Sequence, residues 1–223
     1  MKYISLNHNS SPTSFKKAVI NGLAPDKGLY FPEEKVKLSR NFIESIKNID
    51  DTEICYEIIR EFIGDEIPKN KLLEIINNTI SFKIPLKKIE KSIYSLELFH
   101  GPTLAFKDIG AKFMASCLDF FKDSYTSKKI TVLVATSGDT GGAVAKGFSD
   151  TKDIDVCILY PKGKISKVQE KQITTNGSYV QAIEVEGDFD MCQSMVKRAF
   201  SDEEINRKIA LTSANSINVA RWL

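Results

Sequence analysis

The stretch Ile130-Thr131-Val132-Leu133-Val134-Ala135-Thr136 decides the fold of this chain. It is short, nearly continuously apolar and rich in β-branched residues, which is typical of a strand rather than a helix. A helix is expected after it, at about 140–148, and a second apolar strand follows at 155–160. Strands that alternate with helices predict βαβ units and therefore a parallel sheet.

The same alternation continues toward the end of the chain. The pattern predicts a helix at 166–176, a strand at 179–185, a helix at 188–200 and a strand at 209–212. Residues 218–223 look like the beginning of a further helix, so we expect the chain to be cut within a longer protein. In open parallel sheets ligands bind at the carboxyl ends of the strands, where the turn at Ser137 falls.

The residues before position 95 form, by their periodicity, a mostly helical region after a short extended start. Helices are expected from Phe15 to a terminal Gly22 and at 39–48, 52–63 and 68–78, with a turn-rich connector at 24–32. Residues 93–99 alternate like a strand, and a helix follows across 108–122. We therefore predict an α/β protein with two domains, a mostly helical one at 1–95 and a parallel-sheet α/β domain at 96–223.

The composition argues against several classes of function. Lysine and arginine number 31 together and aspartate and glutamate 29, so there is no basic excess for nucleic acid or a membrane surface. The N-terminus has no continuous apolar stretch of the kind found in secretory signals. No run approaches the about 18 apolar residues that cross a bilayer. We expect a cytoplasmic protein that binds neither nucleic acid nor membrane.

The cysteines and histidines do not fit a metal or redox site. The four cysteines are widely spaced without a CxxC pair, and the chain has two histidines. We expect no metal, and reduced, mostly buried thiols. The residues concerned are Cys55, Cys117, Cys157, Cys192, His8 and His100.

Lys107 is a candidate nucleophile. It lies between Phe106 and Asp108, after the turn-forming run 101–103 and close to Phe99. An amine held in semi-apolar surroundings loses solvation for its charged form, so it becomes a usable nucleophile. We expect Asp108 to cap the helix that follows. A surface lysine at a helix start is the alternative that remains open.

The run Ser137-Gly138-Asp139-Thr140-Gly141 is a candidate anion site. Backbone N–H groups at a turn that opens a helix, together with the hydroxyls of Ser137 and Thr140, suit a carboxylate. The run matches neither GxxxxGK[ST] nor GxGxxG, so a nucleotide phosphate loop is not predicted. An ordinary strand-to-helix turn, with Ser137 or Asp139 as N-cap, is equally compatible with the residues. With Lys107, the run suggests a Schiff-base lysine facing a carboxylate-binding loop.

Residues 212–221 form a third group. Asn and Ser after a strand are typical of a loop and a helix cap, and Arg221 could bind a phosphate or carboxylate if its helix directs it inward. We interpret His100 as a hydrogen-bonded structural residue rather than as a base.

Together, four segments resemble the threonine synthases, pyridoxal-phosphate enzymes of fold type II. They are 14–32, 98–108, 135–142 and 215–221, and they occur in the family's order. The resemblance implies a carbon–oxygen lyase that converts O-phospho-L-homoserine and water to L-threonine and phosphate. It implies that Lys107 holds the cofactor and moves protons, and that the loop 137–140 binds the substrate carboxylate. It further implies that Asn215 and Arg221 bind the substrate phosphate.

Two features of the resemblance limit what it implies. Asp139 would border the cofactor's O3′, where many relatives carry Asn, and a carboxylate beside a phenolate oxygen needs a shared proton. The family's glycine-rich phosphate loop and the hydroxyl at its pyridine nitrogen lie beyond residue 223. We therefore expect this chain to need a C-terminal half, to bind pyridoxal phosphate weakly and not to turn over alone.

Two other interpretations remain open. One is another fold type II enzyme, such as a threonine dehydratase or a phospho-amino-acid lyase, although the helical first 95 residues and the connector 24–32 argue against a dehydratase. The other is a non-catalytic module that only folds or binds a partner.

Overall fold

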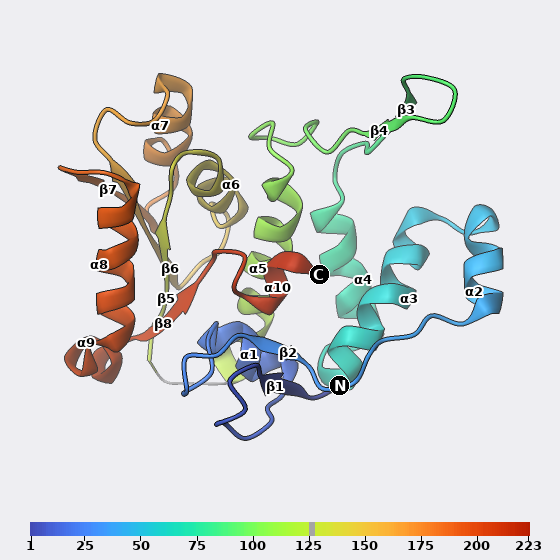
Figure 1. Ribbon diagram of the computed structural model, residues 1–223, viewed down its shortest axis with the longest axis horizontal. Helices are drawn as coiled ribbons and strands as arrows, with labels where there is room; N and C mark the ends of the chain where they lie inside the picture. Colours follow the sequence, from blue (N-terminus) through green and yellow to red (C-terminus); the bar gives the residue numbers. More distant parts are fainter. Residues whose placement is uncertain (125–127) are drawn as a thin grey trace.

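The chain after position 129 forms a four-stranded parallel sheet, which lies toward one side of the molecule. The computed structural model describes residues 1–124 and 128–223. The sheet has the order β7-β6-β5-β8 (Figure 1). Its strands are β5 (Ile130–Ala135), β6 (Ile154–Pro161), β7 (Val180–Val185) and β8 (Ala210–Ser213), and every neighbouring pair is parallel. The predicted α/β class is confirmed, and the carboxyl ends of β5 and β8 lie side by side.

Helices cover both faces of the sheet because β5 is apolar on both. Val132 and Val134 belong to one buried cluster with residues of α5 and α6. Leu133 and Ala135 belong to a second cluster with residues of α8. Helix α5 (Lys107–Phe121) and the 3-10 turn η3 (Lys122–Ser124) precede β5 in the chain. The later helices are α6 (Asp139–Gly147), α7 (Lys167–Thr174), α8 (Phe189–Ser201), α9 (Glu203–Lys208) and α10 (Val219–Trp222).

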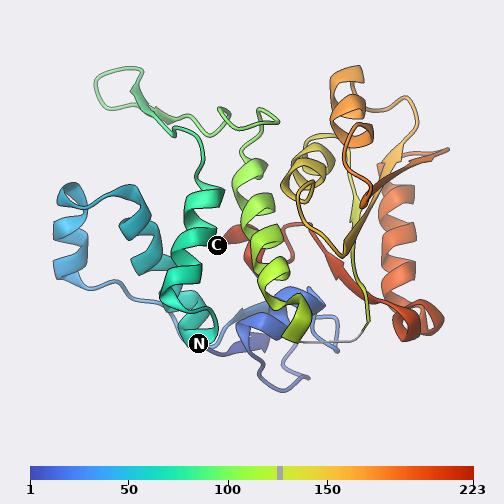
Figure 2. The same cartoon turned by 180° about the vertical axis from the view of Figure 1, so that it is seen from behind.

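The N-terminal region packs directly against this α/β unit. The hydroxyl of Thr212, on β8, donates to the carbonyl of Val19, on α1, across 3.0 Å. Helix α4 lies beside α5 in both views of the chain (Figures 1 and 2). The elements of this region are β1 (Tyr3–Ser5), α1 (Phe15–Asn21), β2 (Tyr30–Pro32), α2 (Arg40–Ser45), η1 (Ile46–Asn48), α3 (Asp51–Ile63), η2 (Gly64–Glu66) and α4 (Lys69–Thr79). Residues before and after position 95 therefore share one buried cluster.

Two local predictions were wrong or incomplete. The strand expected at 93–99 is β4 (Tyr94–Leu96), but it pairs antiparallel with β3 (Leu86–Lys88) in a separate hairpin and does not join the parallel sheet. The short helix α9 was not predicted, although Asp202 caps it by accepting from the N–H groups of Glu204 and Ile205. Pairing partners are set by tertiary packing, which the alternation of a single strand does not encode.

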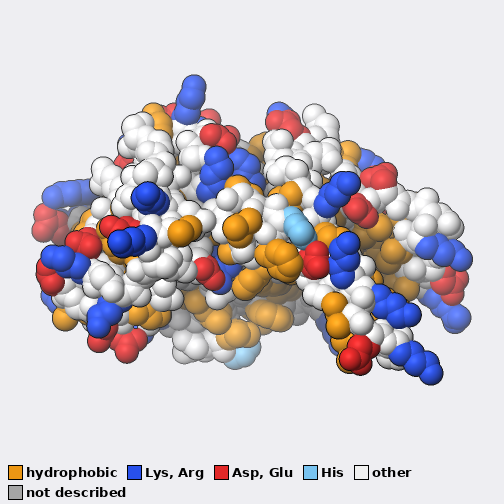
Figure 3. All heavy atoms as spheres, turned by 90° about the horizontal axis from the view of Figure 1, so that it is seen from above, with side chains coloured by type: hydrophobic (Ala, Val, Ile, Leu, Met, Phe, Trp, Pro, Cys, Tyr) orange, Lys and Arg blue, Asp and Glu red, His pale blue; other side chains and the backbone are white. Residues whose placement is uncertain are grey.

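The β3–β4 hairpin exposes a row of apolar side chains. Figure 3 views the molecule from the side on which this hairpin lies, and hydrophobic side chains gather there among charged ones. The exposed apolar residues of the hairpin are Leu86, Ile89, Ile93, Tyr94 and Leu96. None of the helices in the described ranges has the length and apolar character needed to cross a membrane.

Candidate active site

Lys107 is the first residue of α5, and a buried carboxylate fixes the loop before it. Asp108 is 4% exposed and accepts from the N–H of Thr103 at 2.9 Å and from its hydroxyl at 2.5 Å. Asp108 therefore does not cap α5 as expected, because its own backbone is already helical and Phe106 occupies the N-cap position. Its side chain instead holds the preceding turn, in which the N–H of Leu104 donates to the carbonyl of Gly101.

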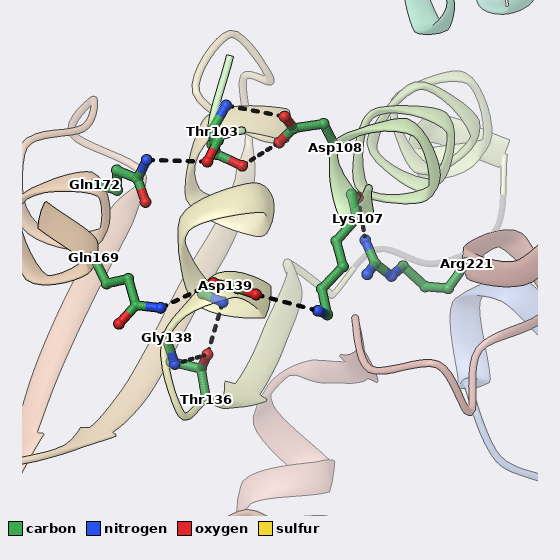
Figure 4. Close-up of polar contacts among 10 residues, drawn as sticks. Thr103, Lys107, Asp108, Thr136, Gly138, Asp139, Gln169, Gln172 and Arg221 are labelled. Carbon is green, nitrogen blue, oxygen red and sulfur yellow. Dashed lines mark hydrogen bonds and ion pairs between the residues drawn. The ribbon is translucent and has the colours of Figure 1, made fainter. Parts of the chain in front are cut away.

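The side chain of Lys107 reaches across to the start of α6. Its Nζ lies 3.6 Å from Oδ2 of Asp139 (Figure 4). The same Nζ lies 4.4 Å from the ring centroid of Phe106. The Lys107 side chain keeps 25% of its surface exposed. The ring of Phe106 shields the amine on one side only, and Phe99 and Phe106 are themselves both exposed. The amine is thus placed by one carboxylate and one ring face.

Thr136 shapes the loop that follows β5. Its hydroxyl oxygen accepts from the N–H groups of Gly138 at 3.0 Å and Gly141 at 2.8 Å. Gly138 occupies the N-cap position of α6 without a side-chain cap, so neither Ser137 nor Asp139 caps the helix. Sequence reasoning missed Thr136, although a threonine that ends a strand shortly before a glycine is a recognisable signal for a side-chain-held turn.

The loop leaves donors available at its mouth. Among residues 1–124 and 128–223, no acceptor lies at the N–H groups of Ser137, Asp139 or Thr140. Two helices, α5 and α6, begin beside this loop, and the N-terminal end of each carries partial positive charge. The loop can therefore bind an anion, as the sequence suggested.

Arg221 closes the opposite side of the site. It lies on α10, which Asn218 caps by accepting from the N–H of Ala220, so the expected loop and helix cap are confirmed. Burial lowers the pKa of Arg221 to about 10, and the Asp108 carboxylate offsets part of that effect. In the described part of the chain its buried Nε has no hydrogen-bond acceptor. A buried cation with an unused donor is best satisfied by an anion.

One cavity joins most of the predicted residues. It has a volume of about 670 Å³, and its walls include Lys107, Ser137, Thr140, Asn215 and Arg221. Asp139 contacts Lys107 but does not line the cavity, and Gly138 packs against α7 instead. Helix α8 contributes Phe189 and Gln193, which the sequence did not single out because their role depends on how α8 crosses the sheet.

The other titratable candidates lie outside this cavity. His100 is hydrogen-bonded to Glu97, with 2.8 Å between Nε2 and Oε2, as expected of a structural histidine. All four cysteines are free thiols, of which Cys117 and Cys192 are buried. Within the ranges described, no three histidine, cysteine or acidic side chains gather as metal ligands would.

Two family models match the chain in succession. Residues 2–80 match the N terminus of threonine synthase, and residues 74–223 match the pyridoxal-phosphate dependent enzymes. The chain belongs to the pyridoxal-phosphate-dependent enzyme family. The expected resemblance is thereby confirmed, and Lys107, the Ser137 loop and Arg221 all fall within the part matched by this family's model.

The known proteins that this chain matches include threonine synthases. That of Escherichia coli K12 is 44% identical over the whole chain, which corresponds to 51% of the relative. The crystal structure of E. coli threonine synthase superposes with a TM-score of 0.90 at 43% identity, covering 99% of this chain and 51% of that one. Threonine synthase with bound PLP from Brucella melitensis gives a TM-score of 0.91 at 36% identity, covering 99% and 49%. The chain thus spans about half the length of these relatives.

The residues of the cavity fit part of a bound pyridoxal phosphate. Within the described part of the chain, the N–H groups of Ser137 and Thr140 and the buried Nε of Arg221 have no acceptor, and they face one space together with the Lys107 amine. These are the groups that a carbonyl compound carrying negative charge requires.

Proposed function

We propose that this chain is the N-terminal portion of a threonine synthase, which converts O-phospho-L-homoserine and water to L-threonine and phosphate. The observation that carries the proposal is the shared cavity in which Lys107, the loop after β5 and Arg221 face one another. A substrate with a carboxylate at one end and a phosphate at the other suits a site with donors on two walls. Pyridoxal phosphate, when bound, supplies an electron sink for negative charge at the substrate carbons.

The proposal assigns the following roles to the residues of the site. The amine of Lys107 holds the cofactor and moves protons at Cα, Cβ and Cγ of the substrate. Ser137 and Thr140 bind the substrate carboxylate through their N–H groups and hydroxyls, and Gly138 shapes the loop between them through its bond to Thr136. Asn215 and Arg221 bind the substrate phosphate. Asp139, next to the Lys107 amine, would help to hold the cofactor and could share a proton with its phenolate oxygen O3′.

The remaining proposals concern the whole protein. A mostly helical domain at 1–95 and an α/β domain at 96–223 would be completed by a C-terminal half, which would bring the cofactor-phosphate loop. The small-molecule substrate and the free thiols fit a cytoplasmic enzyme. Without that half we expect weak cofactor binding and no turnover.

A chimera tests the reaction. Residues 1–223 are joined to the second half of the E. coli relative, and the product is given O-phospho-L-homoserine or threonine separately. We expect phosphate and threonine from the first substrate, and neither product from the Lys107→Ala chimera. Ammonia from threonine instead would favour a dehydratase. A soluble chimera that acts on neither substrate would favour a non-catalytic module.

A further inference from the structure

Helix α7 lies unusually close to the loop that begins α6. A Cβ built on Gly138 would lie 2.4 Å from the side chain of Gln169, and one built on Gly142 would lie 3.0 Å from that of Gln172. Gly141 similarly faces Ile173, at 2.9 Å. Gly138 and two glycines in the first turn of α6, Gly141 and Gly142, therefore make room for α7, and α7 brings two half-buried glutamines to the site.

Gln169 is held at both ends of its amide. Its Oε1 accepts from the N–H of Ser166 at 3.0 Å, as part of the capping box of α7. Its Nε2 donates to Oδ1 of Asp139 at 2.9 Å. Because this bond occupies one carboxylate oxygen, Asp139 presents the other, Oδ2, to Lys107.

Gln172 contacts the turn that precedes Lys107. Its Nε2 donates to the carbonyl of Thr103 at 3.2 Å (Figure 4). Thr103 belongs to the turn that leads into Lys107, and Leu104 in that turn has a φ of 61°. A non-glycine residue in this region is strained and persists only where its surroundings fix it.

We propose that Gln169 and Gln172 are positioning residues that together set the place of the Lys107 amine. Gln169 aims Asp139 at the amine, and Gln172 fixes the turn from which Lys107 projects. They lie one helical turn apart on the same face of α7, so a single rigid element controls both contacts. That this amine is catalytic rests on the proposed function, whereas the positioning of the amine by Gln169 and Gln172 does not.

A zero-length cross-link measures the first contact without cofactor. A carbodiimide joins an amine to a carboxylate only when the two touch, so wild-type protein should yield a Lys107–Asp139 link, quantified by peptide mass spectrometry. Gln169→Glu keeps the acceptor for Ser166 but replaces the donor to Asp139 by a like charge. We expect its link yield to fall about fivefold, the effect of losing a charge-assisted hydrogen bond.

Two further variants separate positioning from helix stability. Ser166→Ala removes the other half of the capping box and should lower the melting temperature while leaving the link yield within about twofold. Gln169→Met is an uncharged isostere and should lower the link yield as Gln169→Glu does. A wild-type yield in both Gln169 variants, or an equal loss in Ser166→Ala, would overturn the role of Gln169.

Hydrogen exchange measures the second contact. Gln172→Met should speed exchange in residues 101–108 about fivefold and leave β5 unchanged, because only the turn loses a donor. Unchanged exchange in 101–108 would overturn the role of Gln172. These results and those of the chimera are independent. A chimera that releases no phosphate but shows the expected cross-links would contradict the proposed function and still support the positioning role of Gln169 and Gln172.

Discussion

The guanidinium Nη1 of Arg221 lies 3.3 Å from the backbone carbonyl oxygen of Lys107, 114 positions earlier in the chain. Helices α5 and α10 can approach so closely because Gly110, on α5, has no side chain. A Cβ there would lie 2.4 Å from the carbonyl oxygen of Arg221. Arg221, the proposed phosphate-binding residue, therefore also contacts the backbone of Lys107, the proposed cofactor lysine. One hydrogen bond thus links the two ends of the proposed site.

Arg221→Met should stabilise the chain and weaken anion binding. Burial disfavours the charged guanidinium, whose Nε finds no acceptor in the described ranges, and this outweighs one long hydrogen bond to Lys107. We expect the free energy of unfolding to rise by about 1 kcal/mol, because an apolar residue of similar volume replaces a poorly compensated charge. Affinity for inorganic phosphate should fall about tenfold.

Thermal unfolding and phosphate titration check this pair of effects. Arg207→Met is the matched control, because Arg207 is exposed on α9 and should change neither quantity. A destabilised Arg221→Met variant with unchanged phosphate affinity would mean that Arg221 has a purely structural role.

Because of Tyr3, the free energy of unfolding should fall as the pH becomes alkaline. Its hydroxyl donates to the carbonyl of Phe62 at 2.9 Å, and burial, with smaller contributions from Glu66 and Cys117, raises its pKa. The unfolded chain releases the proton near pH 10, while the folded chain retains it. Stability from this group is therefore complete below pH 10 and is lost as the pH rises further.

Tyr3→Phe tests that dependence. At pH 7.5 the variant should lose about 1 kcal/mol, the usual cost of one buried hydrogen bond. At pH 10.5 the gap between wild type and variant should narrow by about 0.8 kcal/mol, because only the wild type loses stability through this titration. Urea unfolding at both pH values measures the gap, and a gap that stays constant would contradict the assigned cause.

Gly138→Ala should be more costly than Gly163→Ala. Both glycines have positive φ, 137° and 63°, so both variants introduce backbone strain of about 1–2 kcal/mol. Among the described residues, none lies within 4 Å of a Cβ built on Gly163, whereas a Cβ on Gly138 collides with Gln169. Overpacking adds about 1–3 kcal/mol at Gly138 alone. If chemical denaturation gave equal losses in the free energy of unfolding for the two variants, α7 would not be packed tightly against Gly138.

The sheet and its helices could be predicted because their pattern is local. The apolar run that became β5, and the strands at 155–160, 179–185 and 209–212, were recognised with small errors at their ends. Position within the sheet follows from right-handed parallel connections rather than from any single residue. The hairpin pairing of Tyr94–Leu96 escaped prediction because its partner, Leu86–Lys88, carries little strand signal of its own.

The site could be predicted only in part for the same reason. Lys107, Ser137 and Arg221 stand in runs whose composition is unusual, so they were noticed. Thr136 carries a local signal, a threonine between a strand and a glycine, which sequence reasoning missed. Gln169 looks ordinary in the sequence, and only the approach of α7 to the loop shows that it orients Asp139. Contacts between residues 30 or more positions apart leave no local pattern.

The central claim, that Lys107 holds pyridoxal phosphate, is tested most directly by reductive trapping. The chain is incubated with excess pyridoxal phosphate, reduced with borohydride, digested, and mapped by mass spectrometry, with Lys107→Arg as the control. We predict that the label is concentrated on Lys107, and that the variant loses this label while its other lysines react as before. Labelling spread over the surface lysines, with no enrichment at Lys107, would contradict the account.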